Sequence, residues 1–121
     1  MDISLFEKHY DVSKYHCVHF VIDAAKSLLN KDYSKSFIGL TSSLNEAIQT
    51  SRETIIQNKR LKEPRHGCIV LMTSLTGNNH VGLFYGNKVL HLNESGTQYL
   101  SLLMLKCFYT RFRFYEPITD L

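Results

Sequence analysis

Residues 79–92, with the sequence NHVGLFYGNKVLHL, decide the fold of this chain. Two apolar runs flank Gly86 and Asn87, and these residue types accept the positive φ angles of a two-residue hairpin turn. Side chains alternate between the two faces of a strand. We therefore predict an antiparallel hairpin with one histidine on each strand, His80 at the start of the first strand and His91 near the end of the second.

Short apolar runs separated by turn residues surround this hairpin. They predict further strands at residues 68–72, 97–100 and 111–115, and a short helix at residues 102–108. The charged stretch 59–66 contains a proline and is predicted to be a loop.

The period changes in the first half of the chain. Apolar residues recur there at spacings of three and four, which indicates one-sided helices at residues 14–29 and 43–58. Helices followed by an antiparallel succession of strands indicate the α+β class. We therefore expect N-terminal helices packed on a small antiparallel sheet of about 4–5 strands, with residues 1–121 forming a single domain.

The composition argues against several classes of function. The net charge of +3 is a small bias toward anionic partners. The basic residues do not alternate with aromatic residues and glycine as RNA-binding surfaces do, so we expect no nucleic acid partner. Cys17, Cys68 and Cys107 are widely spaced and include no CxxC pair, so we expect neither a disulfide framework nor a metal. No cofactor is expected.

The sequence has no pattern typical of export or membrane insertion. Its first residues are too polar for a signal peptide, and no apolar run approaches the roughly 20 residues that span a bilayer. We therefore expect synthesis in the cytoplasm and no membrane span, with any export depending on a carrier.

Two residues from distant segments have the properties of a thiol nucleophile and its base. Cys17 lies just inside the start of the first predicted helix, and a helix N-terminus carries about half a positive charge, which favours a thiolate with a lowered pKa. His80 opens a strand, where its ring can accept the thiol proton near neutral pH. His91 can share a face with His80 and orient its ring, the role of the third residue in a triad. Cys68 and Cys107 are interpreted as buried structural cysteines.

This order of one cysteine and two histidines resembles the NlpC/P60 family of cysteine peptidases over most of the chain. The matching segments are residues 15–21 (YHCVHFV), 64–72 (PRHGCIVLM), 79–86 (NHVGLFYG), 88–92 (KVLHL) and 96–99 (GTQY). The short members found in phage tails or secreted as effectors look most similar.

The resemblance implies a papain-like α+β fold and hydrolysis of peptide amide bonds in peptidoglycan stem peptides. It also implies a role for each residue of a catalytic triad. Cys17 would be the nucleophile that forms a thioacyl-enzyme, His80 the base and His91 the orienting residue.

The resemblance implies further residues that bind the oxyanion or the substrate. Tyr10 fits the upstream tyrosine of the family better than Tyr15 does, and Asn79 directly precedes the histidine of the hairpin. The partners implied besides the substrate are a phage-tail or secretion-system carrier and an immunity protein. The protein would then be part of a virion, or be delivered to the periplasm or cell wall.

The chain departs from the family pattern beside the cysteine, where His16 and Val18 stand, and at Gly67-Cys68, where a Gly-Asp pair is usual. These departures leave the substrate class open. One alternative is a non-catalytic phage-tail or adaptor module on the same fold. The other is an acyltransferase or deamidase that uses the same Cys-His pair on a host protein or a lipid.

Overall fold

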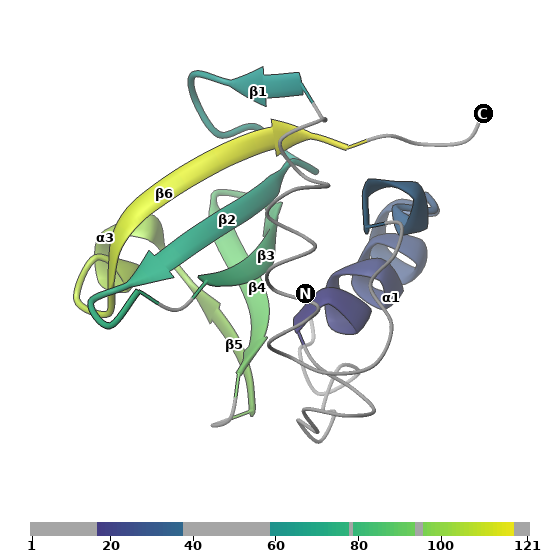
Figure 1. Cartoon of the computed structure of the whole chain (residues 1–121). Coiled ribbons are helices and arrows are strands. Elements are labelled where there is room, and N and C mark those ends of the chain that lie inside the picture. The colour runs from purple at the N-terminus through teal and green to yellow at the C-terminus, as the bar shows by residue number, and fades with distance from the viewer. Residues whose placement is uncertain (1–16, 38–58, 78, 94–95, 118–121) are drawn as a thin grey trace.

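The structure is a computed structural model that describes residues 17–37, 59–77, 79–93 and 96–117 (Figure 1). Three of the sequence-based predictions lie outside these residues. They are the helix at 43–58 and the two tyrosines, Tyr10 and Tyr15.

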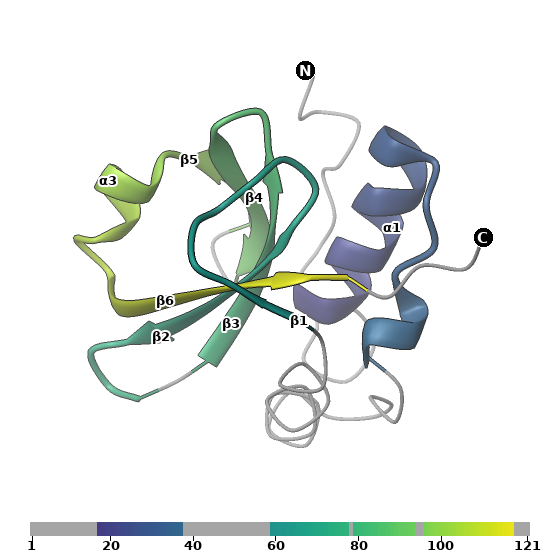
Figure 2. The same ribbon diagram turned by 90° about the horizontal axis from the view of Figure 1, so that it is seen from above.

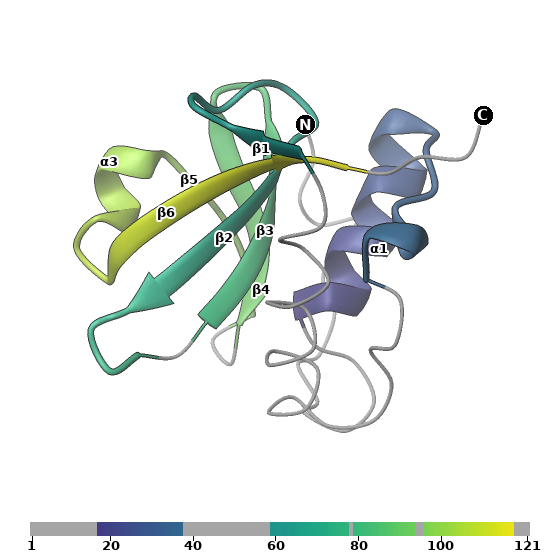
Figure 3. The same ribbon diagram turned by 45° about the horizontal axis from the view of Figure 1, so that its top comes forward.

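The described residues form one main helix, two short helical segments and six strands. In chain order they are α1 (Cys17–Leu29), the 3-10 helix η2 (Ser34–Phe37), β1 (Lys59–Leu61), β2 (Ile69–Ser74), β3 (Asn79–Tyr85), β4 (Lys88–Asn93), β5 (Gly96–Leu100), α3 (Leu102–Leu105) and β6 (Tyr109–Glu116). The strands form one antiparallel sheet in the order β1-β6-β2-β3-β4-β5 (Figure 3). The predicted combination of helix and antiparallel sheet is therefore present.

The predicted number of about 4–5 strands is wrong, because the described residues contain six. The additional strand is β1, which lies in the stretch predicted to be a loop. It pairs with β6 through Lys59↔Glu116 and Leu61↔Phe114. Its three residues are too few to show an alternating pattern, so only the pairing with a distant strand makes it a strand.

The hairpin of β3 and β4 turns at the two predicted residues, but only Gly86 has the expected positive φ, and Asn87 does not. Gly86 has a φ of +56°, and Tyr85 pairs with Lys88 across it. Strands β2 to β5 follow one another as neighbours in the sheet, whereas β6 returns to pair with β2. The start of β3 and the end of β4 are thus held inside the sheet, between β2 and β5.

Helix α1 packs on one face of the sheet, over β3 and β4 (Figure 2). Its buried face includes Phe20 and Val21, which have no exposed surface. Burying an apolar side chain of this size stabilises the fold by ~1.5–3 kcal/mol relative to its exposure. The helix ends at Leu29, and Asn30 follows with a φ of 54°, a conformation common just after helices.

The opposite face of the sheet has its own apolar layer. It contains Cys68, Val70, Met72, Phe84, Val89, Leu105 and Tyr109. Helix α3 is attached to this layer by Leu105, which has no exposed surface. The hydroxyl of Ser101 caps α3 by accepting a hydrogen bond from the Met104 N–H, and the helix is shorter than the predicted 102–108. A helix packs against each face of the sheet.

Candidate active site

Cys17 is the first residue of α1, and its side chain is only 1% exposed. Three backbone N–H groups, those of Val81, Val18 and Cys17 itself, lower the pKa of the thiol. Burial acts in the opposite direction and is the larger effect, so the pKa rises to about 11. The thiol therefore carries its proton at neutral pH in this conformation.

The prediction that Cys17 is a thiolate at neutral pH is thus wrong for this conformation. The backbone donors of the helix start are present, as the sequence indicated, but they do not compensate for the loss of solvent around a charged sulfur. The sequence shows where a helix begins, but it does not show how deeply its first residue is buried.

The contact between the Cys17 sulfur and Val81 depends on how β3 and β4 separate. Their pairing extends from Tyr85↔Lys88 to Leu83↔Leu90, with no further pair toward the start of β3. The Phe84 N–H points to β2, where it bonds the Cys68 oxygen at 2.9 Å. Since N–H directions alternate along a strand, the Val81 N–H points to the β4 side, where it interacts with the sulfur.

This arrangement places Cys17 beside the residue that follows His80. The rings of His80 and His91 lie on the sheet face opposite α1, and both meet the ring of Tyr109 edge to face. The ring centroids are 5.9 Å apart for His80 and Tyr109, and 6.3 Å apart for His91 and Tyr109. The structure therefore brings Cys17, His80 and His91 to one end of the β3–β4 hairpin.

Gly82 is required for this position of His91. An added Cβ at Gly82 would lie 2.5 Å from Val89 Cγ1 and 3.2 Å from His91 Cβ. Both distances are shorter than ordinary van der Waals contact, so any larger residue would push β4 away from β3. The glycine between the two predicted catalytic positions therefore has a packing role.

His91 is completely buried. Burial is the main cause that lowers its pKa to about 4; the neighbouring His80 contributes in the same direction, and Gln98 opposes the shift. Gln98 is the register partner of His91 on β5. Neither ring nitrogen of His91 has a hydrogen-bond partner of good geometry among the described residues. His91 is therefore neutral at physiological pH.

Tyr109 belongs to this group, although no pattern in the sequence indicated it. Burial raises its pKa, and the Cys17 thiol acts in the same direction. It reaches the histidine face through an irregularity in the β2–β6 pairing, where Thr73 pairs with Arg111 but Ser74 pairs with Tyr109. The extra residue, Thr110, turns Tyr109 to the other face of the sheet.

Asn79 was predicted to bind substrate, and the structure places it in a polar chain on the sheet. The Thr73 hydroxyl donates to Asn79 Oδ1 at 2.7 Å, and the Arg113 guanidinium donates to Thr73 Oγ1 at 2.7 Å. Arg113 is only 5% exposed. The side-chain oxygen of Asn79 thus already accepts a hydrogen bond and orders the start of β3.

The other two cysteines differ from each other. Cys68 is buried, as predicted, and burial raises its pKa. Cys107 was also predicted to be buried, but it is exposed because α3 ends before it.

Within the described ranges, no three His, Cys, Asp or Glu side chains are placed to hold a metal ion. No helix in this part of the chain is long and apolar enough to cross a membrane.

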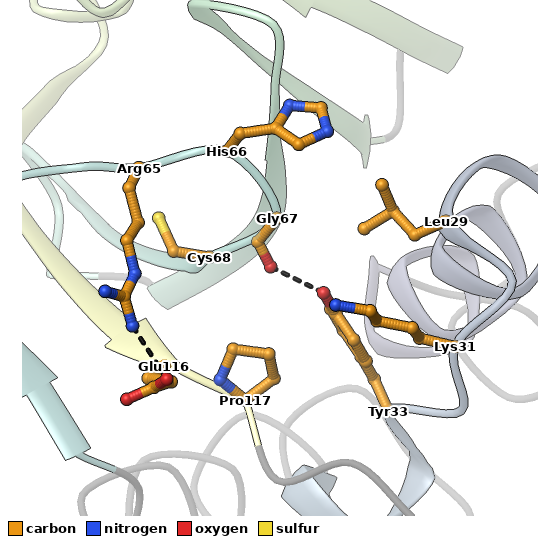
Figure 4. Close-up of a pocket in the computed structure, with 9 residues that line it drawn as sticks. All are labelled: Leu29, Lys31, Tyr33, Arg65, His66, Gly67, Cys68, Glu116 and Pro117. Atoms are coloured by element: carbon orange, nitrogen blue, oxygen red, sulfur yellow. Dashed lines mark hydrogen bonds and ion pairs between the residues drawn. The ribbon is translucent and has the colours of Figure 1, made fainter. Parts of the chain in front are cut away.

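A hollow of about 380 Å³ lies beside Cys68 and not beside Cys17 (Figure 4). Tyr33 donates a hydrogen bond to the Gly67 oxygen there at 2.7 Å, and Arg65 pairs with Glu116 at 2.7 Å. His66, at its rim, accepts a hydrogen bond from the Gly86 N–H at 3.0 Å through Nδ1. These polar groups already bind one another, which gives no reason to place the chemistry here.

The hollow is also remote from the two histidines of the hairpin. Cys68 directly precedes β2, whereas Met72, four residues further on, is the register partner of His80. Four residues of strand span about 13 Å. The chain thus contains two separate cysteine regions, which we name the Cys17 region and the Cys68 region.

No protein-family model matches this sequence, and no curated protein is similar to it.

Proposed function

We propose that the protein is a cysteine hydrolase of the NlpC/P60 type that cleaves peptide amide bonds in peptidoglycan stem peptides. One observation supports this more than any other. The Val81 N–H, which directly follows His80 in the chain, interacts with the sulfur of Cys17. Cys17 and His80, which are more than sixty residues apart in the sequence, would thus act together at one end of the hairpin.

The reaction would proceed in two stages. In the first, the Cys17 sulfur attacks the carbonyl carbon while its proton passes to His80, and a tetrahedral oxyanion forms. The carbon–nitrogen bond then breaks, and the amine leaves with the proton from His80. In the second stage, His80 takes a proton from water, whose oxygen attacks the thioester and releases the acid and the thiol.

The surrounding residues would support these steps without reacting. The Cys17 N–H, in the first described turn of α1, would help to stabilise the oxyanion. His91 and Tyr109 pack against His80 on its own face of the sheet and restrict its ring. A neutral His91 is suited to this, since a second positive charge would oppose protonation of His80.

The protonated resting thiol determines the order of events. With a pKa of about 11 for Cys17, the fraction of thiolate at neutral pH is small, so deprotonation accompanies attack and does not precede it. Because His80 must be unprotonated to accept the proton, cleavage is expected to rise from acidic toward neutral pH and then to level off. A rate that is constant from mildly acidic to alkaline pH would argue against this order.

Incubation with muropeptides of defined cross-link, followed by mass spectrometry, tests the proposal. Wild type and Cys107→Ser should each release products that have gained one water per bond cleaved, because Cys107 lies outside the site. Cys17→Ala and His80→Ala should release none. Undiminished cleavage by both of these variants would refute the proposal.

A non-catalytic phage-tail or adaptor module is the second candidate function. Its specific support is that Cys17 is only 1% exposed and that its thiol, with a pKa raised to about 11 by burial, retains its proton. A peptide substrate analogue with a thiol-reactive electrophile separates the two candidates. Rapid modification of Cys17, with Cys68 unmodified, favours the hydrolase, whereas modification of Cys107 alone favours the module.

A further inference from the structure

Four large apolar side chains stand out on the surface of the described residues. Leu75 and Leu103 are each 76% exposed, Met104 is 55% exposed and Phe108 is 60% exposed. Apolar residues scattered singly on a surface need no explanation, but a contiguous group marks a contact surface. The question is therefore whether these four lie together.

The strand pairing and the turn after α3 place them at the same end of the sheet. Ser74 pairs with Tyr109, so the next residue on one side, Leu75, lies near the preceding residue on the other, Phe108. The Phe108 N–H bonds the Leu105 oxygen at 2.9 Å, which brings Phe108 back toward α3. In all three ribbon views α3 and the turn after β2 lie on the side remote from α1 (Figures 1, 2 and 3). We name these four residues the apolar tip.

The charges around the apolar tip are positive. Lys106 directly follows α3, Arg111 lies on β6, and both are exposed. No Asp or Glu occurs in residues 96–115. A compact group of exposed apolar side chains with cationic neighbours is typical of surfaces that enter the headgroup region of an anionic bilayer.

We infer that the apolar tip docks onto an anionic lipid bilayer surface. The four side chains would enter the interface while Lys106 and Arg111 contact lipid phosphates. A second copy of this chain fits less well, because two such tips facing one another would bring like charges together. This inference does not rest on the proposed hydrolase activity, since none of these residues belongs to the Cys17 region.

The anchoring of the tip also suits this role. Leu105 is fully buried against the sheet and fixes α3, so that Leu103 and Met104 project without disturbing the core.

Vesicle flotation measures the proposed contact. The purified full chain is mixed with vesicles of phosphatidylcholine alone, or with about one quarter phosphatidylglycerol. We expect flotation with the anionic vesicles only, reduced by added salt. The double variant Leu103→Gln/Phe108→Gln should bind at least about fivefold less, since insertion of apolar surface provides much of the affinity.

A matched control separates docking from general charge attraction. Lys26→Gln/Lys31→Gln removes two exposed cations near the end of α1 and should leave flotation within about twofold, whereas Lys106→Gln/Arg111→Gln should reduce it like the apolar double variant. Circular dichroism verifies that each variant is folded, and Met104→Gln replaces any that is not.

Three results would overturn the inference. They are the absence of flotation by wild type, equal loss in the two cation variants, and flotation that is unchanged in every folded variant of the apolar tip. Sedimentation equilibrium tests the alternative that a second copy of this chain binds the apolar tip. A wild-type dimer that Leu103→Gln/Phe108→Gln converts to monomer would assign the tip to a second copy and contradict the lipid assignment.

Discussion

The Cys17 and Cys68 regions contain equally buried thiols in different surroundings. Each side chain is 1% exposed, and burial is the largest cause that raises the pKa of each. Cys17 has three backbone donors near its sulfur and lies beside the start of β3. Cys68 has Arg65 and Tyr33 as neighbours and adjoins the hollow of about 380 Å³.

The two regions differ in the groups that their backbone N–H and C=O groups bind. The Cys68 N–H bonds the Arg65 oxygen at 3.0 Å, and its oxygen accepts from the Phe84 N–H at 2.9 Å. Its peptide groups are thus used within the sheet and its adjoining turn. Around Cys17 the pairing of β3 and β4 has ended, and backbone donors point to the sulfur. Backbone donors reach both sulfurs, those of Arg65 and Cys68 itself in the Cys68 region, so the distinction is that Val81, one of the donors to Cys17, directly follows His80.

The largest expected effect comes from exchanging the two thiols for alanine. Cys17→Ala should reduce muropeptide cleavage by about 10³-fold or more, because no other group can form the thioester. Cys68→Ala should retain activity within a few fold when both variants are assayed folded. The reverse result would transfer the site to the Cys68 region and its hollow.

The next largest effect is that of His91 on the pH dependence of the unfolding free energy. The pKa of His91 is lowered from 6.5 to about 4, so below pH 6.5 the unfolded chain binds a proton that the folded chain does not. Stability is therefore lost as pH falls from 6.5 toward 4, by roughly 3 kcal/mol from this residue. Urea unfolding at several pH values should show this slope in wild type and in Cys68→Ala. The slope should be reduced in His91→Gln, and an unchanged slope there would show that His91 is not the titrating group.

Gly82→Ala tests the packing that positions His91. The new Cβ would lie 2.5 Å from Val89 Cγ1, so we expect a loss of about 1–3 kcal/mol in unfolding free energy together with reduced cleavage. Adding Val89→Ala removes the atom that it meets. The double variant should lose less stability than the sum of the two single variants, and strict additivity would count against this contact.

Arg65→Ala should have the smallest effect. The Arg65–Glu116 ion pair has a length of 2.7 Å, but its side chains are 57% and 43% exposed, so solvent screens most of the attraction. A change of less than about 1 kcal/mol in thermal or urea unfolding is expected, with unchanged cleavage. A large loss of activity in a folded Arg65→Ala protein would show that the Cys68 region takes part in the reaction.

Local patterns in the sequence predicted the hairpin and the main helix well. Gly86 and Asn87 specify the tight turn, and the apolar spacing after Cys17 specifies a one-sided helix. From the turn alone, residue numbers of paired positions sum to about 173, and the observed pair Leu83↔Leu90 agrees. These features depend on residues close in the chain, which is why the sequence reveals them.

The features that were missed depend on distant contacts. Strand β1 exists only through its pairing with β6, and Tyr109 reaches the histidines only because Thr110 is an extra residue in the β2–β6 pairing. The burial of Cys17 likewise results from packing against β3, which no local pattern encodes. The identities of the candidate residues could thus be proposed from sequence, but their protonation and neighbours could not.

The position of β6 has a consequence for how the chain acquires its structure. Although β6 comes latest among the described strands, it lies between β1 and β2 in the sheet. During synthesis, β1 has no neighbour to pair with until residues about fifty positions later have left the ribosome, and loops of this length are slow to close. The β2–β5 meander can form earlier, so nascent chains would expose the β2 edge to aggregation until β6 covers it.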